Sequence, residues 1–244
     1  MKKLYEKNEL TFALVWIGIY CVLQSLANPL NRMLGVEYSA SAALCILQAV
    51  AIFTFVRKNG LMERYGLCRT TFPARRFLYY IPLLLLASRN FWNGVAVNLS
   101  PAGTACYILC MLGVGFVEEM IFRGFLFRAM EKDNARSAIL VSSVTFGLGH
   151  LLNLVNGSGA TLAENLFQVT GAIAIGFCFV ILFYRGGSLW PCIFTHAAIN
   201  ISSAFTNVAG LTVEKRMVFH LLLFVITVGY AVILTRTLPP KERT

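Results

Sequence analysis

Residues 115–127 read GFVEEMIFRGFLF, and they place two adjacent glutamates and an arginine inside a long apolar run. The whole run, residues 103–129, is long enough to cross the roughly 30 Å hydrocarbon core of a bilayer. A charged side chain at the centre of a bilayer costs roughly 2.5 to 3.5 kcal/mol on insertion scales. Glu118, Glu119 and Arg123 therefore mark this run as a membrane span and as a candidate functional segment.

The composition extends this reading to the whole chain. Of its 244 residues, 57% are hydrophobic and only 13% are charged, whereas about 25% are charged in an ordinary soluble domain. We therefore predict an all-α, polytopic membrane protein, with residues 1–244 forming a single transmembrane domain of about eight helices around a membrane-embedded cavity. The expected spans are residues 10–28, 37–56, 77–97, 103–129, 137–153, 163–184, 188–205 and 216–235, of which the fifth and seventh are short.

The basic residues follow this topology. Most of the 21 Lys and Arg residues lie in the tails and in the connections that share a side with them, such as residues 57–76 and 128–136. By the positive-inside rule, both termini are then cytoplasmic. The first run is longer than the 7–15 apolar residues of a signal peptide, so we expect it to be a true span. The net charge of +10 is explained by topology and does not indicate a nucleic-acid partner.

Polar residues within the other spans form a set with these three charges. A lone buried ion pair or histidine is commonly structural, but several such residues in one layer of a membrane indicate function. Arg89, Asn90 and Asn93 form a lesser group, and His220, alone near the end of the last run, is expected to be structural. The main set is Glu118, Glu119, Arg123, His150, His196 and Asn200.

Helix geometry allows this set to meet. With a rise of about 1.5 Å per residue, Glu118 and His150 both lie roughly 20 Å from the cytoplasmic end, and Asn200 lies at about 18 Å. Glu119 and Arg123 are spaced i,i+4, which suits an ion pair, while Glu118 points about 100° away. His196 and Asn200 are also spaced i,i+4 and can offer two hydrogen bonds to one oxygen.

Three short motifs carry these residues in order. EEMIFRG at 118–124 resembles the EExxxR signature, FGLGH at 146–150 the FxxxH signature and HAAIN at 196–200 the HxxxN signature of the CPBP family. That family comprises intramembrane proteases that resemble CAAX prenyl proteases and bacteriocin-processing (Abi) proteins. The resemblance is close over about residues 103–205, the expected catalytic core. The remaining spans resemble the family only in being apolar.

The resemblance implies a glutamate-type protease. Glu118, aided by His150, would activate a water molecule, and His196 and Asn200 would stabilise the oxyanion that forms from the peptide carbonyl. Glu119 and Arg123 would hold this geometry. No cofactor is favoured, but Glu118, His150 and His196 also form a credible Zn²⁺ set with an open position, as in a metalloprotease.

Two other classes of function stay open. Buried charges also occur in transporters and channels, although no inverted repeat is apparent in this chain. A bacteriocin-immunity protein could bind a peptide without cutting it. For a protease, the expected partners are the lipid bilayer and a peptide or lipidated-peptide substrate, in the plasma membrane of a bacterium. The exterior loop NLVNGSGA, residues 153–160, is a candidate gate.

Overall fold

The computed structural model describes residues 1–70, 72–155 and 161–239. The described residues are helical apart from their connections and one isolated bridge between Val95 and Thr206. Most of the candidate gate, residues 156–160, and the basic tail at residues 240–244 lie outside the described residues. The predicted all-α architecture is confirmed.

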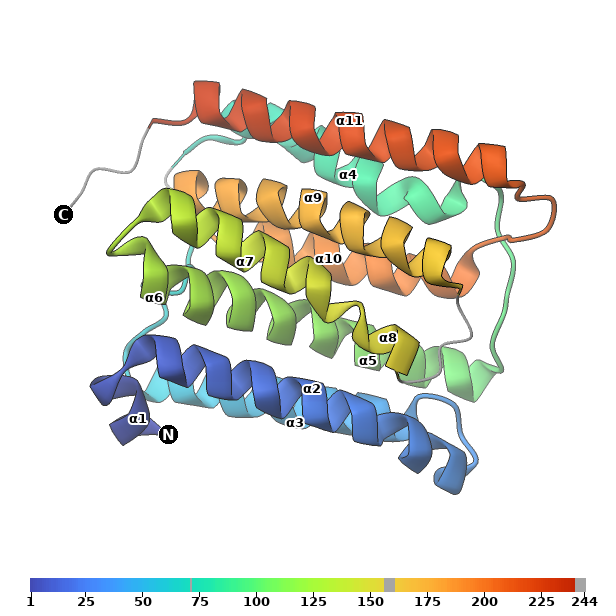
Figure 1. Ribbon diagram of the computed structural model, residues 1–244, viewed down its shortest axis with the longest axis horizontal. Helices are drawn as coiled ribbons and strands as arrows, with labels where there is room; N and C mark the ends of the chain where they lie inside the picture. The colour runs from blue at the N-terminus through green and yellow to red at the C-terminus, as the bar shows by residue number, and fades with distance from the viewer. Residues whose placement is uncertain (71, 156–160, 240–244) are drawn as a thin grey trace.

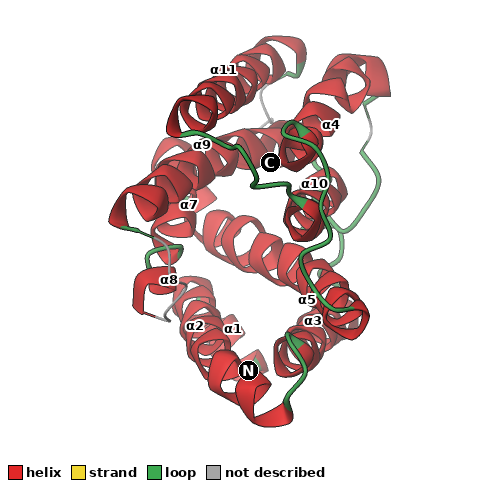
Figure 2. Cartoon of the chain, turned by 90° about the vertical axis from the view of Figure 1, so that its right-hand side faces the viewer, coloured by secondary structure: helices red, strands yellow, loops and turns green. Residues whose placement is uncertain are grey.

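The helices stack in layers, as Figures 1 and 2 show. Helices α2 (Glu9–Leu34) and α3 (Ser39–Lys58) form one outer layer. Helices α11 (Val213–Thr237) and α4 (Ile81–Ser88) form the other outer layer. The region between the two outer layers contains short helical segments and the longer helices α5 (Pro101–Glu119), α7 (Ala135–Gly149), α9 (Leu162–Gly186) and α10 (Trp190–Ser202). The shorter elements are α1 (Lys2–Lys7), η1 (Ala74–Tyr80), η2 (Arg89–Phe91), η3 (Met120–Phe127), α6 (Arg128–Glu131), α8 (Leu152–Val155) and η4 (Ser203–Phe205).

Five helical segments of the described chain are long and apolar enough to cross a membrane: α2, α3, the continuous stretch Pro101–Glu131, α9 and α11. The most apolar window of Pro101–Glu131 is 56% buried, whereas those of α2 and α11 are only 22% buried. The segment with the glutamates is therefore central, and the outer helices present their apolar side chains to lipid. Helices α7 and α10 are shorter, as predicted for the fifth and seventh spans, and pack between the longer helices.

The helix boundaries follow from local sequence. Ser100 accepts a hydrogen bond from the backbone N–H of Gly103 and precedes Pro101, which suits the first turn of α5. Thr161 and Glu164 form a reciprocal capping box at the start of α9, and Gly187 ends that helix with a φ of 77°. Such caps provide hydrogen-bond partners for backbone groups at the helix ends, which the hydrocarbon of the bilayer cannot provide.

The predicted third span, residues 77–97, is wrong as a continuous helix. Leu78, Tyr79 and Tyr80 have φ values of 50°, 52° and 60°, so the backbone turns left-handed before α4 begins at Ile81. Pro82 in the first turn of α4 explains the break, because it has no N–H to continue a helix from residue 78. Only the eight residues of α4 are regular, and this broken segment packs against α10 and α11.

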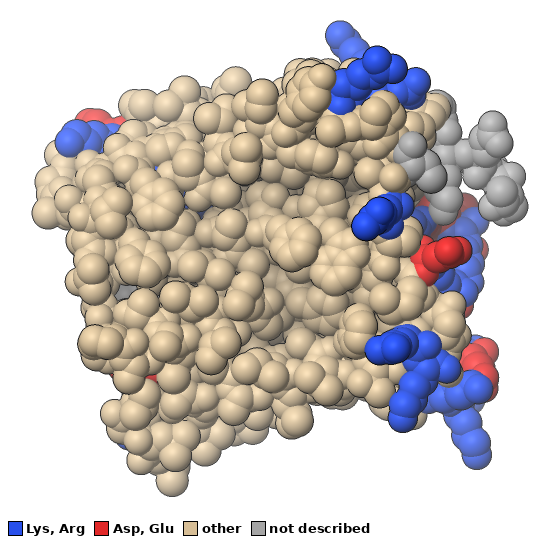
Figure 3. Space-filling view, turned by 180° about the vertical axis from the view of Figure 1, so that it is seen from behind, with Lys and Arg blue, Asp and Glu red and all other residues tan. Residues whose placement is uncertain are grey.

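Basic side chains gather at one end of the bundle. Figure 3 shows Lys and Arg concentrated along the edge where Figure 1 places both termini. The long, nearly uncharged surface beside that edge is the part that suits lipid. The arrangement in space therefore repeats the charge asymmetry of the sequence.

Gly115 allows α5 to approach α10 closely. A Cβ atom added at Gly115 would lie 2.9 Å from the Cβ and backbone N of Ala197, the residue next to His196. These atoms are fixed by the backbone of α10 and cannot rotate away. We expect Gly115→Ala to lower the free energy of unfolding by about 1 to 3 kcal/mol through overpacking.

Thermal unfolding of the detergent-solubilised protein, compared with Gly18→Ala, measures this effect. A Cβ at Gly18 meets nothing within 4 Å, so that variant should change stability by less than about 1 kcal/mol. Equal midpoints for the two variants would contradict the close approach of α5 and α10.

Candidate active site

The two glutamates lie where the helix changes type. Glu118 and Glu119 end α5, and Met120–Phe127 (η3) continues as a π-helix with wider hydrogen-bonded turns. Such segments are uncommon and frequently occur at functional sites. All eight residues of η3 are buried, so Arg123 lies deep in the bundle.

Glu119 and Arg123 form the predicted ion pair. Arg123 Nη1 lies 3.2 Å from Glu119 Oε1, and neither side chain has any exposed surface. The guanidinium also lies 4.0 Å from the ring centroid of Phe146 on α7, a cation–π arrangement. Arg123 therefore joins the first motif to the second.

Glu119 has a further partner on α10. Nδ1 of His196 lies 2.8 Å from Glu119 Oε1, and Nε2 of the same ring lies 3.5 Å from Glu118 Oε2. Because a carboxylate only accepts, Nδ1 donates to Glu119, and Nε2 is the ring nitrogen next to Glu118. One imidazole thus bridges the two adjacent glutamates. The i,i+4 spacing of the sequence did not predict this contact.

Glu118 is held by a tyrosine that the sequence reasoning missed. The hydroxyl of Tyr20 on α2 donates a hydrogen bond to Glu118 Oε1. Gln24, one turn further along α2, points to the same side and donates to Cys45 Sγ at 3.2 Å. The polar i,i+4 pair Tyr20 and Gln24, in a largely apolar run, was the signal that could have revealed this contact.

His150, His196 and Asn200 line one cavity of about 520 Å³. The ring of Phe146 lies between the two histidines, with centroid distances of 5.6 Å to each. Glu118 is not among the lining residues and reaches the cavity through His196. The structure therefore brings the second and third motifs together at a cavity and places the first motif directly behind it.

The backbone around Asn200 is anchored by hydrogen bonds. Its carbonyl accepts from the hydroxyls of Tyr107 at 3.2 Å and Ser203 at 2.7 Å. The side-chain amide makes no hydrogen bond with another described residue. It is therefore available to a group that enters the cavity.

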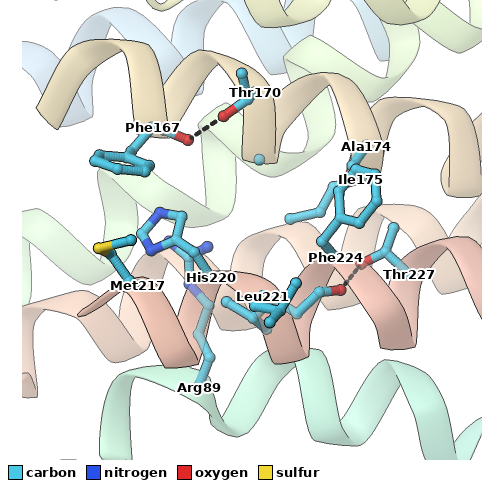
Figure 4. A pocket seen from close by; sticks show the side chains of 12 residues that line it. Arg89, Phe167, Thr170, Ala174, Ile175, Met217, His220, Leu221, Phe224 and Thr227 are labelled. Carbon is cyan, nitrogen blue, oxygen red and sulfur yellow. Dashed lines mark hydrogen bonds between the residues drawn. The ribbon is translucent and has the colours of Figure 1, made fainter. Parts of the chain in front are cut away.

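Arg89 and His220 also line this cavity, although the sequence ranked the first as secondary and the second as structural. His220 does have a structural contact, since its Nδ1 lies 3.0 Å from the carbonyl of Arg216. Figure 4 shows Arg89 extending toward His220 between α9 and α11. Both residues belong to the wall of the site.

The zinc alternative requires its three residues to form a common coordination site. Among the described residues, no three His, Cys, Asp or Glu side chains are grouped so that they could hold a metal ion. In this arrangement His196 directs Nδ1 to Glu119 and places Nε2 near Glu118. The side chains of Glu118, His150 and His196 therefore do not form a common coordination site in this structure.

The buried ion pair predicts a large effect on stability. Arg123→Met would leave Glu119 buried without its cation, and we expect a loss of about 3 to 5 kcal/mol. Arg216→Met removes a pair with Glu164 in which both side chains are 43% exposed, so its loss should be below about 1 kcal/mol. The measurement is the thermal unfolding of both variants in the same detergent. Similar losses for the two variants would show that burial does not set the strength of the Glu119–Arg123 pair.

The comparison with protein families agrees with this geometry. Residues 100–202 match the family described as type II CAAX prenyl endopeptidase Rce1-like. The matched segment runs from the cap of α5 to the end of α10 and contains all three motifs. Neither the curated proteins nor the solved structures compared with the chain gave a match. The predicted CPBP resemblance is confirmed over this segment, which is similar to type II CAAX prenyl endopeptidases and lies in a chain with several helices apolar enough to cross a membrane.

Proposed function

We propose that this protein is a glutamate-type intramembrane endopeptidase in which Glu118 activates the attacking water. The observation that carries the proposal is the connected set Tyr20, Glu118, His196, Glu119 and Arg123, which ends at a cavity lined by His150 and Asn200. Each member is held by the next. The set is therefore preorganised for one geometry, as catalysis requires.

Glu118 is the general base in this proposal. The hydroxyl of Tyr20 holds one carboxylate oxygen, and the other faces His196. A water molecule beside that oxygen gives its proton to Glu118 while its own oxygen attacks the peptide carbonyl. His150, which lines the cavity together with His196, orients the water. When the C–N bond breaks, the proton passes to the leaving amine.

Glu119 and Arg123 act as positioning residues. The hydrogen bond from Nδ1 to Glu119 fixes the ring of His196, so that Nε2 donates to an oxyanion only when the ring carries both protons. His196 and Asn200 would then be the oxyanion donors, each worth about 3 to 4 kcal/mol.

The cavity defines how a substrate enters. Glu164 and Arg216 lie at the starts of α9 and α11, at the end of the bundle opposite the termini, and both line the cavity. With both termini in the cytoplasm of a bacterium, a peptide or lipidated peptide would enter from the outer side of the plasma membrane. The bilayer positions such a substrate at the mouth.

Glu118→Gln should abolish peptide cleavage, because an amide of the same shape cannot accept the proton of water. We expect kcat to fall by at least about a hundredfold, within the range of general acid–base contributions. The measurement is cleavage of a fluorogenic peptide library by the purified protein in lipid nanodiscs, with mass spectrometry of the products. Glu63→Gln, an exposed glutamate in the second connection, is the matched control.

The same assay is run with and without a metal chelator. Unchanged activity of the wild type in the chelator supports the metal-free mechanism, and loss that added Zn²⁺ restores would contradict it. Retained cleavage by Glu118→Gln would contradict the role of Glu118. Peptide binding without cleavage by the wild type would instead indicate a binding protein.

Tyr20→Phe tests the contact that the motifs do not contain. Removing the hydroxyl frees Glu118 from its hydrogen bond while keeping the ring in place. A hydrogen bond to a charged group is worth about 1.5 to 3 kcal/mol, so kcat should fall about ten- to a hundredfold with little change in KM. Tyr107→Phe is the control, because it loses a hydrogen bond to the backbone of the third motif and leaves Glu118 unaffected. It separates loss of the Glu118 contact from loss of a tyrosine hydroxyl elsewhere in the site. An unchanged kcat in Tyr20→Phe would remove Tyr20 from the mechanism.

A further inference from the structure

Arg89 is fixed at the wall of the active-site cavity by its neighbour. It follows α4, and the side-chain amide of Asn90 donates to the carbonyl of Ile199 at 2.7 Å and to the hydroxyl of Ser202 at 2.8 Å. These acceptors belong to α10, the helix that carries His196 and Asn200. The backbone at Arg89 is therefore tied to the same element as the third motif.

Two cavities meet at Arg89. A smaller one of about 260 Å³ lies between α9 and α11, and it shares Arg89, Phe167 and His220 with the active-site cavity of about 520 Å³. Figure 4 shows the side chain of Arg89 reaching from its own segment toward His220. The guanidinium is thus at the junction of the two spaces.

Arg89 has no anionic partner in the described part of the chain. No described carboxylate lies within the 4.0 Å of an ion pair, whereas Arg123 has Glu119 and Arg128 has Glu131. The acid that lines the same cavity, Glu164, already pairs with Arg216 at 2.8 Å. An arginine inside a membrane protein normally has a partner, because the unpaired charge is costly. The missing partner is therefore expected from outside the chain.

We propose that Arg89 binds a carboxylate of the peptide substrate; this rests on the proposed protease function. A guanidinium matches a carboxylate through two parallel hydrogen bonds, which gives both strength and orientation. The cavity has the volume of a sphere about 10 Å across, and an extended residue spans about 3.5 Å. The bound carboxylate is thus only a few residues from the scissile bond. Its source is the C-terminus or an acidic side chain of that short segment.

The test is a binding measurement on the full chain in nanodiscs. The probes are acetyl-trileucine and its C-terminal amide, whose apolar side chains suit the cavity wall, and the readout is thermal stabilisation as a function of peptide concentration. The wild type should respond to the acid at about ten- to a hundredfold lower concentration than to the amide. Arg89→Gln should remove this difference and leave the response to the amide unchanged.

Two further variants make the result specific. Arg89→Lys keeps the charge but loses the two parallel donors, so its preference for the acid should be intermediate. Arg136→Gln removes an exposed arginine at the other end of the bundle and should keep the full preference. The pair acetyl-Leu-Asp-Leu-amide and acetyl-Leu-Asn-Leu-amide tells an acidic side chain from a C-terminal carboxylate.

Equal responses of the wild type to all matched acid and neutral probes would overturn the proposal. An equal loss for both members of each pair in Arg89→Gln would do the same. Stabilisation that requires phosphatidylglycerol and Arg89, with no acid preference, would assign the arginine to a lipid phosphate instead. An acid preference with no cleavage of any peptide contradicts only the protease function, and cleavage without that preference contradicts only the role of Arg89.

Discussion

The fold of this protein depends on the carboxylate of Glu119. Because it has no exposed surface, it must be neutralised from within the protein, and it takes Arg123 from its own helix and His196 from α10. The second contact fixes α10 against α5, and Gly115 leaves the space for that approach. A requirement of electrostatics thus sets a distance between two helices, and that distance places the third motif beside the first.

The neighbouring glutamate is in a different environment although it is only one residue away. Successive residues on a helix point about 100° apart, so Glu119 faces the interior while Glu118 turns toward α2 and the back of the cavity. Its side chain retains 12% exposure and meets Tyr20 and one nitrogen of His196. The two adjacent acids therefore differ in environment. Glu119 is fully buried in an ion pair, and Glu118 stays partly exposed beside His196.

Hydropathy and helical spacing predict the parts of this protein that depend on local sequence. They locate the long spans and the Glu119–Arg123 pair. The contacts that complete the site join residues far apart in the chain, such as Tyr20 and Glu118, which are separated by 98 positions. No periodicity within one helix encodes such a contact. The sequence predicts a structural role for His220 for the same reason, since the cavities that it lines also need side chains from other helices.

The two departures from regular α-helix in this bundle both serve the site. The π-helix at Met120–Phe127 directly follows Glu118 and Glu119, and the broken segment before and after α4 brings Arg89 and Asn90 to α10. Each departure disrupts the regular hydrogen bonding of an α-helix within the membrane, where backbone groups have no water to bond. Sequences keep such irregularities where the position of a side chain matters more than the regularity of the backbone. The failure of the predicted span at residues 77–97 is therefore informative. In a straight helix, Arg89 would simply continue along the helix axis, and Asn90 could not hydrogen-bond to the helix that carries the third motif.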